Sequence, residues 1–219
     1  MIYALENPDF LKITDKNDAF YGGAQAWFSD KFSVNGGCGV TAAANILAYL
    51  AASDEKYARL YPQESLTKQD FTAFMEELCG FVKIRNFFGQ PLGVWGEKRF
   101  EKGVLDYAKS RGVSLSAVEF RGKMNLASAA DFIKNALSEN LPVAMLIGFN
   151  KRLKNVQCVY PSGGTIGGSF ERHWVTITEL SENDGKFTVK VSSWGAFAFI
   201  DLADFIEGEK IYSALVHFK

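Results

Sequence analysis

A glycine-flanked cysteine at the start of an apolar segment constrains this chain more than any other feature. The segment from Asn35 to Leu50 reads NGGCGVTAAANILAYL, with glycines on both sides of Cys38. The apolar residues that follow are spaced as on one face of a helix, namely Ala43, Ile46, Leu47 and Leu50. We therefore predict a helix that begins at Cys38 and buries this face.

The position of Cys38 suggests chemistry as well as structure. Unpaired amide N–H groups and the helix dipole favour an anion at a helix N-terminus, so a thiolate or an oxyanion would be stabilised there. The neighbouring glycines relieve backbone crowding and would leave the sulfur unshielded. The alternative interpretation is a buried, inert cysteine, because free cysteines are among the most buried residues. One cysteine at a helix start does not decide between the two.

The length and the charge of the chain limit the number of domains and the kinds of partner to expect. With 219 residues, the chain is expected to form a single domain spanning residues 1–219. Its 24 basic and 25 acidic residues predict no long-range attraction to nucleic acid or to an anionic membrane. The first residues lack the basic start and the apolar run of a secretory signal, so we expect none, and no apolar run reaches the roughly 18 residues of a membrane span. We therefore expect a cytoplasmic protein without membrane insertion and leave the oligomeric state open.

The three cysteines do not form the pattern of a disulfide framework. Cys38, Cys79 and Cys158 are odd in number and widely spaced, which favours a reducing compartment. Redox sensing by Cys38 would need one of the other two as a resolving partner. No paired ligand unit typical of zinc sites occurs, and no G-x-S-x-G elbow of a serine hydrolase occurs.

Hydrophobic periodicity predicts helices in the first two thirds of the chain and strands in the last third. Residues 1–34 are expected to form a mostly irregular leader, and residues 85–96 a loop. We expect helices at 38–50, from Thr67 to about 79, at 97–110 and at 125–140. We expect strands at 113–120, 143–149, 172–180, 187–194, 197–200 and 211–218, with a mobile glycine-rich flap at 161–168. The Asp184-Gly185 pair predicts a hairpin, and the order of elements predicts an α+β fold.

Only two histidines are available as a base for Cys38. His173 begins a predicted hairpin strand and is the candidate, whereas His217, near the end of the chain, is expected to be structural. The alternative for His173 is a core histidine bonded to the backbone. A Cys–His pair needs a third group to orient the imidazole. Ser192 or Ser193 can accept a hydrogen bond from it, although neither carries a negative charge.

Three segments, taken in order, resemble the papain-like cysteine peptidases. They are NGGCGVTAAANI around Cys38, RHWVTI around His173 and VSSWG from 191 to 195. The resemblance covers about residues 20–50 and 165–207 and is closest to the bacterial branch similar to bacteriocin-processing, double-glycine leader peptidases. It implies a papain-like α+β fold in which an N-terminal helical part packs on a C-terminal antiparallel sheet. It implies no metal or other cofactor.

The resemblance also implies a role for each site residue. Cys38 matches the nucleophile and His173 the general base, and Gln25, the only glutamine before Cys38, matches the oxyanion donor. Ser192 stands where the family has Asn or Asp. Asp201 or Asp204 could take that third role if the chain folds back.

A second departure from the family pattern concerns the oxyanion donor. Gln25 lies 13 residues before Cys38, a longer gap than in papain, so Asn35 is the alternative donor. The expected function is a thiol hydrolase that cleaves a peptide or amide bond in a peptide or protein substrate through an acyl-enzyme. The alternative is a non-catalytic papain-like module that binds a peptide or protein partner in its cleft.

Overall fold

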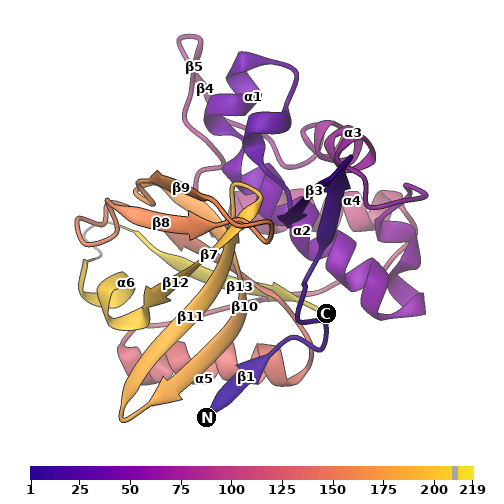
Figure 1. The fold of residues 1–219 in the computed structure, drawn as a ribbon. Helices are drawn as coiled ribbons and strands as arrows, with labels where there is room; N and C mark the ends of the chain where they lie inside the picture. Colours follow the sequence, from indigo (N-terminus) through magenta and orange to yellow (C-terminus); the bar gives the residue numbers. More distant parts are fainter. Residues whose placement is uncertain (209–211) are drawn as a thin grey trace.

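The computed structural model describes residues 1–208 and 212–219, and its largest element is a nine-stranded antiparallel sheet (Figure 1). The strand order is β6-β13-β7-β10-β11-β12-β8-β9, and β1 pairs with residues 179–181 in the C-terminal part of β10. The strands are β1 (Ile2–Ala4), β6 (Ala117–Glu119), β7 (Val143–Ile147), β8 (Val156–Val159), β9 (Thr165–Gly168), β10 (His173–Asn183), β11 (Lys186–Ser193), β12 (Ala196–Asp201) and β13 (Ala214–Phe218). The predicted α+β class is confirmed.

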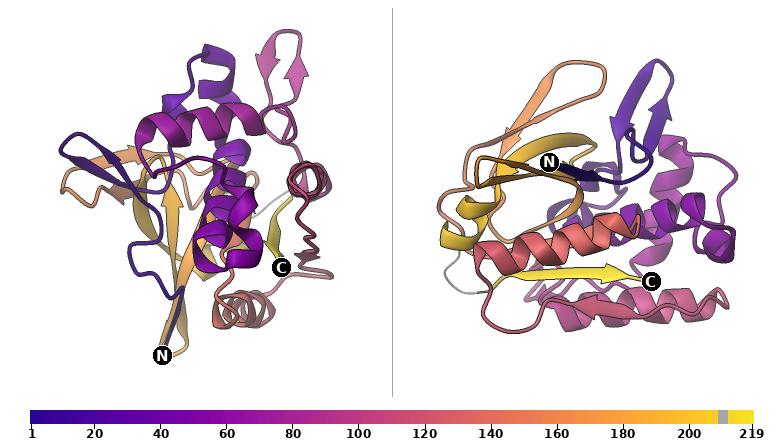
Figure 2. Two further views of the ribbon diagram at one scale, coloured as in Figure 1. Left: turned by 90° about the vertical axis from the view of Figure 1, so that its right-hand side faces the viewer. Right: turned by 90° about the horizontal axis from the view of Figure 1, so that it is seen from below.

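Helices cover both faces of this sheet. The α-helices are α1 (Lys31–Gly36), α2 (Cys38–Ser53), α3 (Lys68–Leu78), α4 (Glu97–Ser110), α5 (Leu126–Ser138) and α6 (Leu202–Gly208). Two 3₁₀ turns are η1 (Gln25–Trp27) and η2 (Glu55–Leu60). Helix α2 lies against one face, and α5 runs along the opposite face, as Figures 1 and 2 show from three directions.

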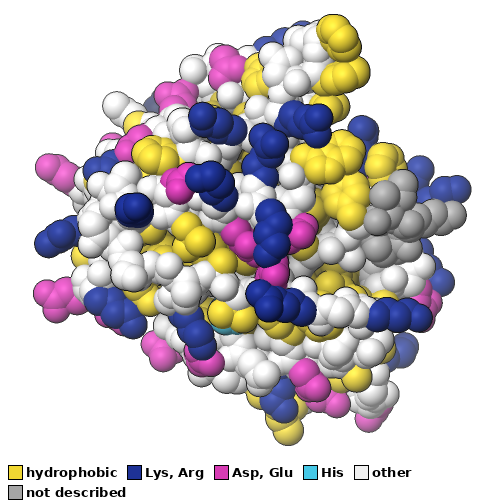
Figure 3. All heavy atoms as spheres, turned by 180° about the vertical axis from the view of Figure 1, so that it is seen from behind, with side chains coloured by type: hydrophobic (Ala, Val, Ile, Leu, Met, Phe, Trp, Pro, Cys, Tyr) yellow, Lys and Arg dark blue, Asp and Glu magenta, His cyan; other side chains and the backbone are white. Residues whose placement is uncertain are grey.

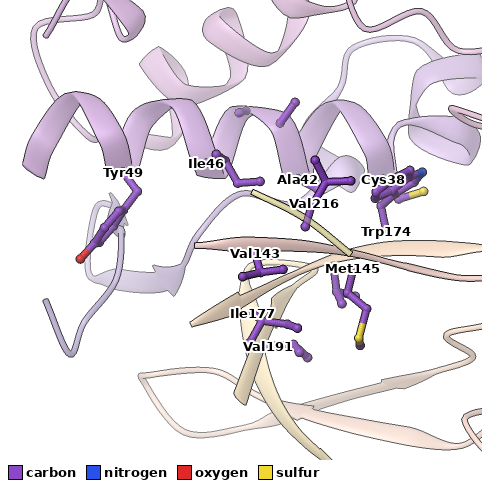
Figure 4. Packing of buried hydrophobic residues seen from close by; sticks show 14 of the residues in the cluster. Cys38, Ala42, Ile46, Tyr49, Val143, Met145, Trp174, Ile177, Val191 and Val216 are labelled. Carbon is purple, nitrogen blue, oxygen red and sulfur yellow. The ribbon is translucent and has the colours of Figure 1, made fainter. Parts of the chain in front are cut away.

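Helix α2 is the centre of the core. It begins at Cys38, as predicted, but every residue from Cys38 to Leu50 is buried, so the helix is enclosed on all sides rather than on one face. In Figure 4, Ala42 and Ile46 point from α2 toward the strands that carry Val143 and Val216. A helix buried on all sides has little freedom to shift, so the position of Cys38 is set by the core.

Several predicted elements are confirmed together with the residues that delimit them. The Thr67 side chain accepts a hydrogen bond from the Asp70 N–H at 3.2 Å and caps α3, whereas Asn125 caps α5 in the same way. Helix α4 has the predicted bounds. Asp184 and Gly185 have φ angles of 49° and 77°, the positive values that a two-residue type I′ hairpin turn requires.

The prediction of an irregular leader at 1–34 is wrong. Strand β1 pairs with β10, β2 (Lys12–Asp15) pairs with β3 (Asp18–Tyr21), and η1 and α1 follow. These elements are short, and most are fixed by partners distant in sequence, so local periodicity does not reveal them.

The structure also revises other segments. Half of the glycine-rich flap is β9, which pairs with β8, and neither β8 nor α6 was predicted. The loop at 85–96 contains a small hairpin of β4 (Asn86–Phe87) and β5 (Gln90–Pro91). Strand β6 occupies three residues of the predicted 113–120, and β13 begins at Ala214, whereas the predicted strand start, Ile211, lies outside the described residues. In the described part of the chain, no helix is both long and apolar enough to cross a membrane.

Candidate active site

Cys38 is placed by the junction of two helices. Asp30 caps α1 by accepting a hydrogen bond from the Ser33 N–H at 2.9 Å, and Gly37 alone separates α1 from α2. Cys38 is the first residue of α2, so no carbonyl of that helix can accept its N–H. This N–H is the donor that an oxyanion beside the sulfur would use.

The glycine after Cys38 allows the walls of the site to close. A Cβ atom on Gly39 would lie 2.7 Å from Val94 Cβ and 3.1 Å from Trp174 Cδ1, so any larger residue would push these walls apart. Cys38 is only 8% exposed. The expectation that the glycines leave the sulfur unshielded is therefore wrong, because Gly39 serves close packing instead.

Cys38 and His173 line the same cleft. The cleft has a volume of about 260 Å³, and its lining also includes Gln25, Asn35 and Arg172. Behind it lies a cavity of about 10 Å³, which is room for about one water molecule. Gln25, Cys38 and His173 line both spaces, which places the three predicted residues at one site.

His173 is held by a serine, although not by the one that the family pattern indicated. It is the first residue of β10, and its Nε2 lies 2.7 Å from Ser193 Oγ in a hydrogen bond. Ser192 is correspondingly turned away from the imidazole and donates to the Tyr21 carbonyl at 2.7 Å. Neighbouring strand residues point to opposite faces, so one of two adjacent serines can reach the ring. The assignment of Ser192 as the orienting residue is corrected to Ser193.

Neither acidic candidate reaches the imidazole. Asp201 accepts a hydrogen bond from the Ala203 N–H at 2.8 Å, and Asp204 pairs with Arg152 at 3.2 Å. Both carboxylates therefore interact with groups in or near α6 and not with His173. Among the described residues, His173 has no acidic partner, and Ser193 is its hydrogen-bonding partner.

Asn45 is a site residue that the sequence reasoning missed. Its Oδ1 accepts the Gly23 N–H at 2.8 Å, and its Nδ2 donates to Ser192 Oγ at 3.3 Å. With Thr41 it lines the small cavity behind Cys38. The sequence contained a signal for Asn45: Cys38, Thr41 and Asn45 are spaced i, i+3 and i+7, so they lie on one face of the helix. A polar residue on that face of an otherwise apolar helix is unusual.

Trp174 is a second missed residue, and it joins three walls of the site. Its indole N–H donates to the Val94 carbonyl at 2.9 Å, and its ring stacks on Phe100 of α4 at 4.3 Å. Figure 4 shows Trp174 beside Cys38 at the start of α2. Trp174 thereby connects the strand that carries His173 with the segment that follows the β4–β5 hairpin.

Gln25 lines the cleft and the small cavity together with Cys38, but its amide is partly engaged. Its Nε2 donates to the Val34 carbonyl at 2.8 Å, which leaves one N–H of that amide, and its buried Oε1 has no hydrogen-bond partner among the described residues. Asn35 is exposed and lines only the outer cleft. Gln25 is therefore the better-placed donor of the two.

Burial disfavours the charged forms of both reactive groups. The imidazole of His173 packs against the rings of Phe170 and Trp194, at centroid distances of 5.2 and 5.1 Å, and burial lowers its pKa to about 4. Burial also raises the pKa of the Cys38 thiol, and the backbone N–H groups of Trp174, Gly39 and Cys38 only partly offset this effect. This direction is opposite to the one expected from the helix dipole, because desolvation outweighs the dipole.

The resting pair is therefore a neutral thiol beside a neutral imidazole. In the described part of the chain, no hydrogen bond joins Cys38 to His173. All three cysteines are free thiols, with Cys158 buried on β8. His217 is buried on β13, 5.3 Å from the Phe132 ring, and lines neither of the two spaces at Cys38.

The described residues contain no group of three or more His, Cys, Asp or Glu side chains that could hold a metal ion. A scan against models of protein families gives no match, and a search of curated proteins gives none either.

Proposed function

We propose that this protein is a papain-like thiol hydrolase that cleaves a peptide or amide bond in a peptide or protein substrate. One observation carries the proposal: Cys38 and His173, from distant parts of the chain, line one cleft, and Ser193 holds the imidazole. Gln25 and Cys38 line the same small cavity, so the Gln25 amide and the N–H of Cys38 at the helix start are the candidate oxyanion donors. A nucleophile, a base and oxyanion donors are the parts that acyl transfer needs.

The arrangement assigns a step to each residue. With the proton on Nε2 donated to Ser193, Nδ1 of His173 accepts the Cys38 proton as the sulfur attacks the substrate carbonyl carbon. The N–H of Cys38 and the Gln25 amide stabilise the oxyanion. The C–N bond then breaks, and the imidazolium gives its proton to the leaving amine. Water, deprotonated by His173, hydrolyses the thioester and restores the thiol.

A binding module without catalytic activity is the second candidate. The observation that favours it is the neutral resting pair, since the low pKa of His173 and the raised pKa of Cys38 both oppose a thiolate. In this alternative, the cleft of about 260 Å³ holds a peptide without cleaving it. The two candidates differ in whether a bound peptide is cut at Cys38.

A peptide library generated by digesting a cell lysate distinguishes the two candidates. The wild type and the variants Cys38→Ala and Cys79→Ala are incubated with the library at pH 7, and new peptide termini are identified by mass spectrometry. We expect cleavage by the wild type and by Cys79→Ala, which removes a thiol outside the cleft, and none by Cys38→Ala. Cleavage that persists in Cys38→Ala would overturn the mechanism, and peptide retention without cleavage by the wild type would favour the binding module.

A further inference from the structure

The β4–β5 hairpin projects from the body of the protein beside α1 (Figure 1). Its two strands pair only with one another, outside the main sheet. Two backbone hydrogen bonds close its base, from the Arg85 N–H to the Gly93 carbonyl at 2.9 Å and from the Leu92 N–H to the Arg85 carbonyl at 2.8 Å. The hairpin is thus an ordered arm that adds nothing to the central core.

Large apolar side chains are concentrated on this arm. Phe88 at its tip is 92% exposed and Phe87 is 55% exposed. With Leu92 at the base of the arm and Trp95 just beyond it, where it stacks on Tyr212 at 5.4 Å, they make up four of the nine large hydrophobic side chains that are exposed in the described part of the protein. The Phe87 and Phe88 rings contact each other edge to face at 4.7 Å. Such a concentration of exposed apolar side chains is typical of an interaction site.

The turn itself does not explain Phe88. Phe88 and Gly89 form a two-residue turn with φ angles of 48° and 81°. Asn or Gly adopts the first of these positions readily, whereas a bulky residue at positive φ is strained. Folding would therefore favour Asn at position 88, and solubility would favour a polar residue. A strained, exposed aromatic residue indicates a function outside the fold.

The charged residues of the segment that forms the arm are both basic. Residues 80–96 include Lys83 and Arg85 and contain neither Asp nor Glu. Both side chains are exposed, and within residues 1–208 and 212–219 neither forms an ion pair. Figure 3 shows hydrophobic side chains gathered at one edge of the molecule, with Lys and Arg side chains, and some Asp and Glu, on the surface below them.

We propose that this arm docks the protein peripherally on a bilayer that contains anionic lipid. Phe87 and Phe88 enter the boundary between headgroups and acyl chains, and Lys83 and Arg85 contact the lipid phosphates. Exposed aromatic rings at a projecting tip, with two exposed basic side chains close behind them in the chain, match the apolar layer and the anionic surface of a bilayer. The near-zero net charge gives no long-range attraction, so binding depends on this local pairing of aromatic and basic residues.

Docking in this way would also position the cleft. Pro91 and Leu92, at the base of the arm, are part of the wall of the cleft that contains Cys38. The cleft opening would then be held close to the membrane surface. The docking itself does not depend on whether Cys38 is catalytic.

Sedimentation with vesicles tests the proposal. The full chain is mixed with vesicles of phosphatidylcholine alone or with about a third phosphatidylglycerol, at low and at high salt. The aromatic variant is Phe88→Asn, which suits the turn and should fold at least as well as the wild type. The charge variant is Lys83→Gln with Arg85→Gln. The matched control is Phe199→Ser, which removes an exposed phenylalanine of β12 outside the arm.

We expect the wild type and the control to bind the anionic vesicles more than the neutral ones, and less at high salt. Phe88→Asn should lower the partition coefficient about tenfold, the effect of one buried aromatic side chain. For each cation removed, the charge variant should show a partition coefficient about fivefold lower on anionic vesicles. It should therefore also lose its preference for anionic over neutral lipid. A wild type that stays in the supernatant with both vesicle types would overturn the proposal, and so would Phe88→Asn binding as well as the wild type.

Discussion

Lowering the pH from 7 to 5 should destabilise this protein because its two histidines are buried in the neutral form. His173 and His217 are 7% and 5% exposed, and burial lowers the pKa of each from 6.5 to about 4. Below pH 6.5, the two histidines of the unfolded chain bind protons, whereas those of the folded chain stay neutral until the pH reaches about 4. Stability is therefore fully present above pH 6.5 and is lost as the pH falls toward 4.

The expected loss follows from these pKa values. Between pH 7 and pH 5, each histidine lowers the free energy of unfolding by about 2 kcal/mol, so both together lower it by about 4 kcal/mol. Small domains are stable by roughly 5–15 kcal/mol, so a loss of this size is readily measured. Most carboxylates titrate below this pH range, which leaves the histidines as its main titrating groups.

Urea unfolding at pH 7 and pH 5 measures the effect in the wild type, in His173→Gln, in His217→Gln and in the double variant. Glutamine does not titrate and can still hydrogen-bond at either position. We expect each single variant to lose about 2 kcal/mol less than the wild type on acidification, and the double variant about 4 kcal/mol less. If His173→Gln loses as much stability as the wild type, or if NMR shows His173 titrating near 6.5, the imidazole is not desolvated and the reasoning is refuted.

Two further predictions concern the surroundings of the pair. Of the two serines, Ser193 contacts the imidazole and Ser192 does not. Ser193→Ala should therefore remove the part of the Cys38 alkylation rate that depends on His173, whereas Ser192→Ala should retain it. Equal alkylation rates in the two variants would contradict the assignment of Ser193 as the residue that orients His173. Gly39→Ala should lower the free energy of unfolding by about 1–3 kcal/mol, because its Cβ would lie 2.7 Å from Val94 Cβ. Urea unfolding at pH 7 checks this value, and unchanged stability would show that the walls can separate freely.

The sequence predicted those parts of the fold that local chemistry determines. Helix α4 and the turn at Asp184-Gly185 follow from apolar spacing and from the preference for positive φ. Strand β1 has three residues and exists only because β10 provides its partner, so no local pattern reveals it. The same holds for β8, whose partners β9 and β12 both follow it in the chain.

The sequence predicts which residues line the candidate site better than it predicts their protonation states. Cys38 and His173 meet in one cleft, as the motif order predicted. The choice between Ser192 and Ser193 depends on strand register, which the sequence leaves open. The protonation state of the pair depends on burial by aromatic rings from other segments, and a helix-dipole argument gave the wrong direction for Cys38.

Alkylation of Cys38 by iodoacetamide across a range of pH tests whether His173 acts as the base for the Cys38 thiol. Labelling is followed by mass spectrometry of the peptides, with Cys79 and Cys158 as internal references and His173→Ala as the comparison. If His173 serves as the base, Cys38 should be labelled at pH 7 at least about tenfold faster in the wild type than in His173→Ala. This difference should disappear as the pH falls through about 4, where the imidazole becomes protonated. Equal rates and equal pH profiles in the two proteins would contradict the account, because His173 would then do nothing for the thiol.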